Sequence, residues 1–428
     1  MNPPAPHLNV FQQLIIQWER LHPYNAAQAM RLTFAPSIEQ LTSAWRAALT
    51  MLGLGTVWHD DGKVIHDFSP GVIAASVIRP IDSEDHLNDY LSGQLNLAFE
   101  QGELPYRPFS CTTSSGAIVG VVYHHWVCDS FCIRSLLREW LYHLVSPDRV
   151  TGTPMLTARH GYWHHFGPGA AGWPVLPALL QQLSQSGRLR HCRRVHVGRA
   201  NESNAAFAQV RAPAGLVAAV RHVSRRRGVK VNDLFLVALA KTARDLAPLE
   251  PPHHRHDLAL GSIVDLRNLP GRSPADAFGM FLGFTNTILR GEVMGDTEKL
   301  LAAVAAQSRL ARERRLAQAG QIRMSFGLLA GAIFDDRNLR EFYRKRLPLA
   351  GGISNITLHN SWAAEAHPNY ISEYLRVSPT GPFMPLVLTP TTLGDALHLG
   401  ITTRINGAGA PTGASIGRRF LHELENLT

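Results

Sequence analysis

SGAIVGVVYHHWVCDSFCIRSLLREWLYHL, residues 115–144, contains a strand pattern, a short polar turn and a helix pattern in immediate succession. The run Ile118–Tyr123 is apolar and rich in β-branched residues, which predicts a buried strand whose successive side chains point to opposite faces. His124 and His125 follow at the end of that strand. Because of this alternation, the two imidazoles cannot both face the same cavity.

A polar turn follows the two histidines and precedes the helix pattern. Either Asp129 or Ser130 can cap that helix, because apolar residues recur at helical spacing between residues 131 and 144. The arrangement places one imidazole at a strand end, close to a loop carboxylate. A neutral imidazole there is suited to take a proton from a hydroxyl or an amine. The alternative is structural, with two satisfied histidines and Asp129 acting as a helix cap.

Helix and strand patterns also alternate on either side of this segment, which predicts an α/β fold. SIEQLTSAWRAALTML at 37–52 predicts a helix that follows a Pro-Ser start. The second half contains further strand and helix patterns, in the order NESNAAFAQVRAP (201–213), AGLVAAVRHVSRRRGV (214–229), VNDLFLVALAKTARDLA (231–247), LALGSIVDLR (258–267), FTNTILR (284–290), TEKLLAAVAAQSRLARERRLAQA (297–319), SNITLHN (354–360) and ALHLGITTR (396–404).

The chain has 428 residues, too many for one comfortable hydrophobic core. We therefore expect two domains of roughly 200 residues each. Residues 146–175 are rich in Gly and Pro without sustained periodicity, which predicts a linker. The expected units are an N-terminal half, 1–175, that carries the histidine segment, and a C-terminal half, 176–428.

Composition indicates a folded chain, since 45% of the residues are hydrophobic and 18% are charged. No apolar run approaches the roughly 18 residues needed to cross a bilayer, and the N-terminus lacks a secretory pattern. We expect a cytoplasmic protein without a membrane partner. The four cysteines have neither disulfide-framework nor zinc-site spacing, so no metal site is predicted.

The formal net charge of +9 favours an acidic partner. The densest basic stretches, 191–196 and 221–230, lack the interleaved aromatic residues of a base-stacking surface. Nucleic acid is therefore not the expected partner.

HHWVCDS at 124–130 resembles the HHxxxDG motif of the condensation-domain superfamily. That superfamily includes condensation domains of nonribosomal peptide synthetases, chloramphenicol acetyltransferase, polyketide-associated acyltransferases and wax ester synthases. Three further segments resemble it in the same order along the chain: GVKVNDLFLVALAKTAR (228–244), IVDLRNLPGRSPADAFGMFLGFTNTIL (263–289) and ISNITLHN (353–360).

The resemblance implies two chloramphenicol-acetyltransferase-like α/β sandwich halves that form a pseudo-dimer with a tunnel between them. By position, His125 is the implied catalytic residue, which removes the acceptor's proton or positions it while stabilising the tetrahedral intermediate. His124, on the opposite face, is expected to be structural. Asp129 is expected to turn away from the tunnel and to pair with Arg267.

Ser130 departs from the motif, because the family commonly has Gly at that position. Its side chain either narrows the donor channel, donates a hydrogen bond to an intermediate, or simply caps the helix. By resemblance only, the tunnel wall is expected to include Trp126, Asn286, Ser354 and Asn355. The alternative for each asparagine is a bond to local backbone.

The resemblance implies a stand-alone condensation enzyme of specialised metabolite biosynthesis. It would transfer an acyl, peptidyl or polyketide chain from a carrier-protein phosphopantetheine thioester to an alcohol or amine, forming an ester or amide or releasing the chain. The expected partners are an acidic acyl or peptidyl carrier protein and a small-molecule acceptor. No bound cofactor or metal is expected, because the thioester carries the activation.

Three alternatives stay open at this point. One is a coenzyme-A-dependent O- or N-acyltransferase of the same fold, and another is a non-catalytic module that docks carrier proteins. The third is an epimerase, because epimerisation domains share the motif, although they normally lie within larger synthetases. A monomer is expected, because the pseudo-dimer is internal to the chain.

Overall fold

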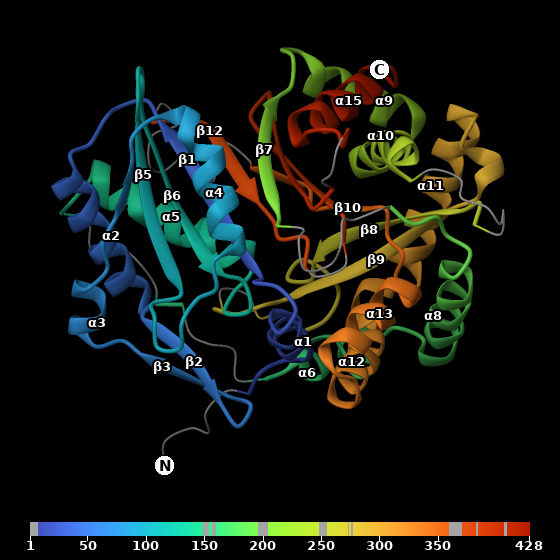
Figure 1. The fold of residues 1–428 in the computed structure, drawn as a ribbon, viewed down its shortest axis with the longest axis horizontal. Helices are drawn as coiled ribbons and strands as arrows, with labels where there is room; N and C mark the ends of the chain where they lie inside the picture. The colour runs from blue at the N-terminus through green and yellow to red at the C-terminus, as the bar shows by residue number, and fades with distance from the viewer. Residues whose placement is uncertain are drawn as a thin grey trace.

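The computed structural model describes residues 7–148, 154–155, 160–195, 204–247, 255–272, 274, 277–358, 370–381, 384–405 and 409–428. Within them, two sheet-containing halves lie side by side, each with helices packed on its sheet (Figure 1). The predicted α/β class is confirmed. No helix in this part of the chain is long and apolar enough to cross a membrane.

Five strands form the sheet of the N-terminal half. Their order is β12, β1, β6, β5 and β4, with bounds Ile371–Val377, Asn25–Leu32, Gly116–His124, Tyr106–Thr113 and Arg79–Ile81. β6 is the central strand and is the one predicted from the histidine segment. β12 comes from late in the chain and pairs antiparallel with β1, so it joins the C-terminal half to this sheet (Figure 1).

Helices cover both faces of this sheet. α2 (Ile38–Leu52) and α5 (Ser130–Val145) share a core with Met30 and Val119 on one face, whereas α4 (Leu87–Asn96) packs against Phe109 on the other. α2 begins where its sequence predicts. The remaining elements of this half are α3 (Pro70–Ala74), the 3-10 helix η1 (Glu84–His86) and the hairpin of β2 (Thr56–Asp60) and β3 (Lys63–Asp67).

Seven strands form the sheet of the C-terminal half. The order β7, β14, β13, β10, β8, β9 has bounds Ala206–Arg211, Ala396–Thr403, Leu386–Leu393, Gly351–Ile353, Leu258–Asp265 and Leu282–Leu289, and β11 (Ile356–Leu358) also pairs with β13. The strands expected in the second half are therefore present. A second apolar core joins this sheet to α9 (Leu216–Arg227), α10 (Val231–Leu246), α11 (Thr297–Glu313) and α15 (Gly413–Glu425).

A third group of helices connects the two halves. α1 (Val10–Glu19) packs on α12 (Leu316–Ile333), and the Gln17 side chain donates to the Leu328 carbonyl at 3.0 Å. Arg20 also pairs with Asp336 of α13 (Asp336–Arg346) at 2.7 Å. These contacts attach the first helix of the chain to the C-terminal half.

The expected linker contains α6 (Tyr162–Phe166) and α7 (Pro168–Ala171), and α8 (Val175–Leu189) begins at its end. Trp173 packs against Leu316 and Ala319 of α12. Residues 149–153 and 156–159 of this linker lie outside the described residues. The domain boundary near residue 175 stays a prediction. The one described element not yet given is the short 3-10 helix η2 (Gly291–Val293), which follows β9.

The single helix predicted at 297–319 is wrong, because the structure has two helices there. α11 ends at Glu313, and Arg315 adopts a left-handed conformation with φ of 52° before α12 begins. A left-handed residue ends a helix by turning the chain out of its path. Neither Gly nor Pro marks the break, and the apolar periodicity continues across it.

Candidate active site

A cavity of about 500 Å³ lies between the two halves. The N-terminal half contributes side chains from α1, β1, β6 and α5, and the C-terminal half contributes them from β8, β9, β10, α12 and α13. Most of the wall is apolar, and Phe11, Ile15, Phe284, Met324 and Ile353 all contribute to it. The cavity therefore suits a ligand with a hydrocarbon part.

His125 lines this cavity just beyond the end of β6. Its backbone N–H donates to the Tyr24 carbonyl, and its Nδ1 lies 3.1 Å from the Cys128 carbonyl oxygen. A carbonyl only accepts, so Nδ1 carries the ring proton and Nε2 keeps its lone pair in the neutral imidazole. Nε2 has no hydrogen-bond partner among the described residues. The ring thus offers one basic nitrogen to a ligand.

The surroundings of His125 keep it neutral. The rings of Tyr24 and Tyr123 flank it, with centroid distances of 5.8 and 5.2 Å. Burial lowers the pKa of the imidazole below its ordinary value, and Arg376 acts in the same direction. A neutral imidazole is the state that a general base requires.

His124 points to the other side of the sheet, where it stacks on Phe99 with a centroid distance of 5.0 Å. Its Nε2 contacts Glu19, and its Nδ1 accepts a hydrogen bond from Trp126 Nε1 at 3.2 Å. Trp126 is consequently turned into the core and is not in the cavity wall. The prediction that Trp126 lines the tunnel is therefore wrong.

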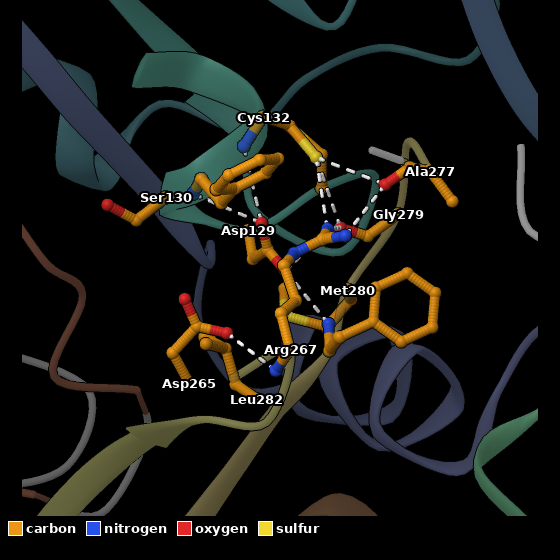
Figure 2. Close-up of polar contacts among 12 residues, drawn as sticks. Asp129, Ser130, Cys132, Asp265, Arg267, Ala277, Gly279, Met280 and Leu282 are labelled. Carbon is orange, nitrogen blue, oxygen red and sulfur yellow. Dashed lines mark hydrogen bonds and ion pairs between the residues drawn. The ribbon is translucent and has the colours of Figure 1, made fainter. Parts of the chain in front are cut away.

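Asp129 and Arg267 form a buried ion pair beside the histidine loop, and Figure 2 shows its contacts. Asp129 Oδ1 accepts from the backbone N–H groups of Phe131 and Cys132 at 3.1 and 3.3 Å. Oδ2 accepts from Arg267 Nη2 at 3.0 Å and from the Phe281 N–H at 2.9 Å. The carboxylate is thus both the cap of α5 and the partner of the arginine expected from the sequence.

The guanidinium of Arg267 is held as tightly as its partner. Its carbon lies 4.6 Å from the centroids of both the Phe131 and Phe281 rings. Nη1 also donates to the Ala277 carbonyl at 2.9 Å. Because Asp129 uses all of its acceptor directions on protein groups, it is not available to contact a ligand.

Ser130 lies in the cavity wall rather than at the helix cap, because Asp129 occupies the cap position. The helix-cap alternative for Ser130 is therefore wrong. Its Oγ accepts hydrogen bonds from Gln28 Nε2 and Arg134 Nη1, each at 3.0 Å. Both lone pairs are then in use, so the hydroxyl can only donate further, and it has no acceptor among the described residues.

Gln28 was not expected from the sequence. It lies on β1, and the Tyr374 hydroxyl of β12 donates to its Oε1 at 2.5 Å. The cross-strand neighbour of Gln28 in this ladder is Arg376, another cavity residue that was missed. The available signal was a polar residue among apolar neighbours in each strand, in AAQAM at 26–30 and in YLRV at 374–377.

Of the remaining tunnel residues, Ser354 and Asn355 lie in the cavity wall. The two terminal nitrogens of Arg376 donate to the carbonyl and hydroxyl oxygens of Ser354, each at 2.8 Å. Asn286 is buried in β9 and is not in the wall, which corrects the expectation for it. Its side-chain atoms also lack hydrogen-bond partners among the described residues, so the backbone alternative is not seen either.

Within the described ranges, no group of three or more His, Cys, Asp or Glu side chains is arranged to hold a metal ion. The four cysteines are free and buried. The polar side chains in the cavity wall include the imidazole of His125, the hydroxyl of Ser130, the carboxylate of Asp265 and the arginines.

Many solved structures resemble nearly the whole chain, among them the following three. Polyketide synthase associated protein 5 from Mycobacterium tuberculosis has 15% identity and a TM-score of 0.64, covering 98% of each chain. The first condensation domain of the CDA synthetase has 13% identity and a TM-score of 0.65, covering 100% of this chain and 97% of that one. The trichothecene 15-O-acetyltransferase from Fusarium sporotrichioides has 10% identity and a TM-score of 0.64, covering 97% and 93%.

The chain therefore has the fold of condensation domains and related acyltransferases. The predicted pseudo-dimer of two chloramphenicol-acetyltransferase-like halves is confirmed. No family model and no curated protein matches the sequence. At these identities the likeness establishes the fold alone.

Proposed function

We propose that the protein is a stand-alone condensation enzyme, an acyltransferase. It transfers an acyl, peptidyl or polyketide chain from a phosphopantetheine thioester on a carrier protein to an alcohol or amine. The observation that supports this most is the neutral imidazole of His125, fixed by Cys128 with Nε2 left without a partner in the cavity between the halves. Specialised metabolite biosynthesis is the expected setting, by analogy with the proteins of this fold.

His125 acts as the general base in this proposal. Nε2 takes the proton as the acceptor oxygen or nitrogen attacks the thioester carbonyl carbon, and the carbonyl electron pair moves onto oxygen. When the tetrahedral intermediate collapses, the carbon–sulfur bond breaks. The imidazolium then gives its proton to the departing thiolate. The products are an ester or amide and a free phosphopantetheine thiol.

Ser130 is the proposed donor to the oxyanion. Its hydroxyl proton is unused, and Gln28 and Arg134 hold its oxygen in place. Because the oxyanion carries a full charge only in the intermediate, a fixed donor stabilises that state more than the ground state. The bond from Arg134 also polarises the hydroxyl toward donation.

The apolar wall supports an acyl donor with hydrocarbon content, since burial of each methylene contributes about 0.8 kcal/mol. The net charge of +9 supports an acidic carrier protein as the source of that donor. The same charge suits the phosphates of coenzyme A, so a coenzyme-A-dependent O- or N-acyltransferase is the second candidate. A docking-only protein has no need for an imidazole oriented like that of His125.

The test uses one acyl chain loaded on an acyl carrier protein, on coenzyme A and on pantetheine. Each donor is incubated with the protein and a mixture of alcohols and amines, and products are identified by mass spectrometry. The proposal expects product from the carrier-bound donor, its loss in His125→Ala, and its retention in His86→Ala, which changes an exposed histidine outside the cavity.

Each other outcome discriminates between the candidates. Product from coenzyme A but not from the carrier would replace the carrier-dependent version with the coenzyme A enzyme. Product that persists in His125→Ala would contradict the proposed role of that residue. A folded protein that gives no product from any donor would favour the docking module.

A further inference from the structure

The charged side chains in the cavity wall are mostly positive. Four arginines line it: Arg134, Arg323, Arg346 and Arg376. None of them forms an ion pair with a described carboxylate. Among the described wall residues the one carboxylate is Asp265, whose pKa is raised chiefly by burial. The cavity is therefore built to receive negative rather than positive charge.

Arg323 differs from the other three arginines. Arg134 and Arg376 donate to serine oxygens, and Arg346 is exposed. The guanidinium of Arg323 instead lies over the Phe284 ring, 4.3 Å from its centroid. Its Nε and Nη1 atoms are buried and have no hydrogen-bond partner among the described residues.

A buried guanidinium without these hydrogen bonds destabilises the folded protein. A charged side chain that has left water is normally paired, and its unsatisfied N–H groups lose their bonds to solvent. Burial alone lowers the pKa of Arg323 to about 10, so the side chain still carries its charge near neutral pH. Within the described residues, the Phe284 ring offsets part of this cost but leaves Nε and Nη1 without a hydrogen bond. An anionic ligand in the cavity would supply those hydrogen bonds.

We propose that Arg323 binds a carboxylate of the substrate, so that the small molecules turned over here carry an anionic group beside a hydrocarbon part. Arginine suits this role because its planar fork matches a carboxylate. Phe284 and Ile263 are cross-strand neighbours on β9 and β8 in the wall and supply the apolar surface. This inference rests on the proposed acyl transfer. The carboxylate belongs either to the far end of the acyl chain or to the acceptor.

Two ligand pairs distinguish these sources by calorimetry. The first pair is the adipoyl and hexanoyl thioesters of N-acetylcysteamine, which differ in a terminal carboxylate and lack any phosphate. The second pair is 3-phenyllactate and 2-phenylethanol, which differ in the carboxylate of an acceptor. Each is titrated into the wild-type protein, Arg323→Met and Arg337→Met. Arg337 is exposed on α13 outside the cavity, so its variant loses the same charge elsewhere.

In one of the two pairs we expect the carboxylate to bind more tightly than its neutral partner. Arg323→Met should weaken that carboxylate by roughly 10- to 100-fold and leave the neutral ligand unchanged, as for a lost hydrogen bond to a charged group. Arg337→Met should behave as wild type. No carboxylate preference in either pair, or a preference that survives Arg323→Met, would overturn the inference.

Thermal unfolding without ligand gives a second readout. Because Met removes an unpaired charge from an apolar wall, Arg323→Met should melt at the same temperature as the wild type or higher. A clearly lower melting temperature would mean that Arg323 serves the fold and would overturn its role as a ligand site. The same titrations are repeated with His125→Ala, because ligand binding does not require turnover. A carboxylate preference in that variant would support the role of Arg323 even if the proposed reaction is wrong.

Discussion

Asp129 and Arg267 are 138 residues apart in the sequence and form a 3.0 Å ion pair that joins the N-terminal half to the C-terminal half. Neither charge faces the cavity, since neither residue is in its wall. Asp129 follows directly on the loop that carries His125. Its role in this account is to hold that loop and the two halves in register.

Asp129→Ala should therefore reduce stability together with activity. It leaves the guanidinium of Arg267 buried without its partner, which we expect to cost about 3 to 5 kcal/mol in the free energy of unfolding. Denaturant unfolding measures the change. The matched control is Asp296→Ala, because Asp296 also caps a helix but its side chain is 43% exposed and pairs with the exposed Lys299. A soluble Asp129→Ala protein with normal stability and no activity would instead indicate a direct chemical role.

The pH dependence of kcat/KM should report the lowered pKa of His125. Activity requires the neutral ring, so the rate should fall toward acid with an inflection below the ordinary histidine value of about 6.5. The imidazole of the unfolded chain has the higher pKa, so it takes up a proton before the folded one as the pH falls below about 6.5. The free energy of unfolding should therefore also decrease toward acid pH. An acid inflection at or above the ordinary value would contradict the buried, neutral imidazole.

Ser130→Ala should lower kcat by roughly 100-fold with little change in KM, because the hydroxyl proton is proposed to be donated only to the oxyanion. The control is Ser135→Ala, one turn further along α5, whose hydroxyl donates to the Phe131 carbonyl. Steady-state kinetics on both variants make the comparison. Equal rates for Ser130→Ala and wild type would remove Ser130 from the mechanism.

The carrier-protein version of the proposal predicts a salt effect. Attraction between a chain of net charge +9 and an acidic carrier is screened by salt, so KM for the carrier-bound donor should rise between low and high ionic strength. KM for the pantetheine thioester of the same acyl chain, which carries no carrier, should change little. Equal salt dependence for both donors would argue against electrostatic docking.

Local patterns predicted the local structure around the site. The alternation along β6 placed His124 and His125 on opposite sides of the sheet, as the structure has them. The sequence offered two candidates, Asp129 and Ser130, for the N-cap of α5. Asp129 is the cap, and Arg267 and the Phe281 N–H hold its other carboxylate oxygen. That contact comes from a distant part of the chain, so no local pattern could decide between the two.

The rest of the site depends on pairing between distant strands. Gln28 and Arg376 are neighbours only because β12 adds to the edge of β1. Likewise, Trp126 and Asn286 carry the right chemistry for a tunnel wall, but packing turns the first toward His124 and buries the second in β9. Arg323 had no signal at all, since one arginine in a helix is ordinarily solvated and only the tertiary fold buries it.

In the proposed reaction, His125 removes the acceptor's proton during acyl transfer. Single-turnover formation of product from carrier-bound donor, measured by mass spectrometry for wild type and His125→Ala at equal folded concentration, tests it most directly. We predict a loss of at least roughly 100-fold in His125→Ala, as for removal of a general base. Product formation at the wild-type rate in that variant would contradict the account.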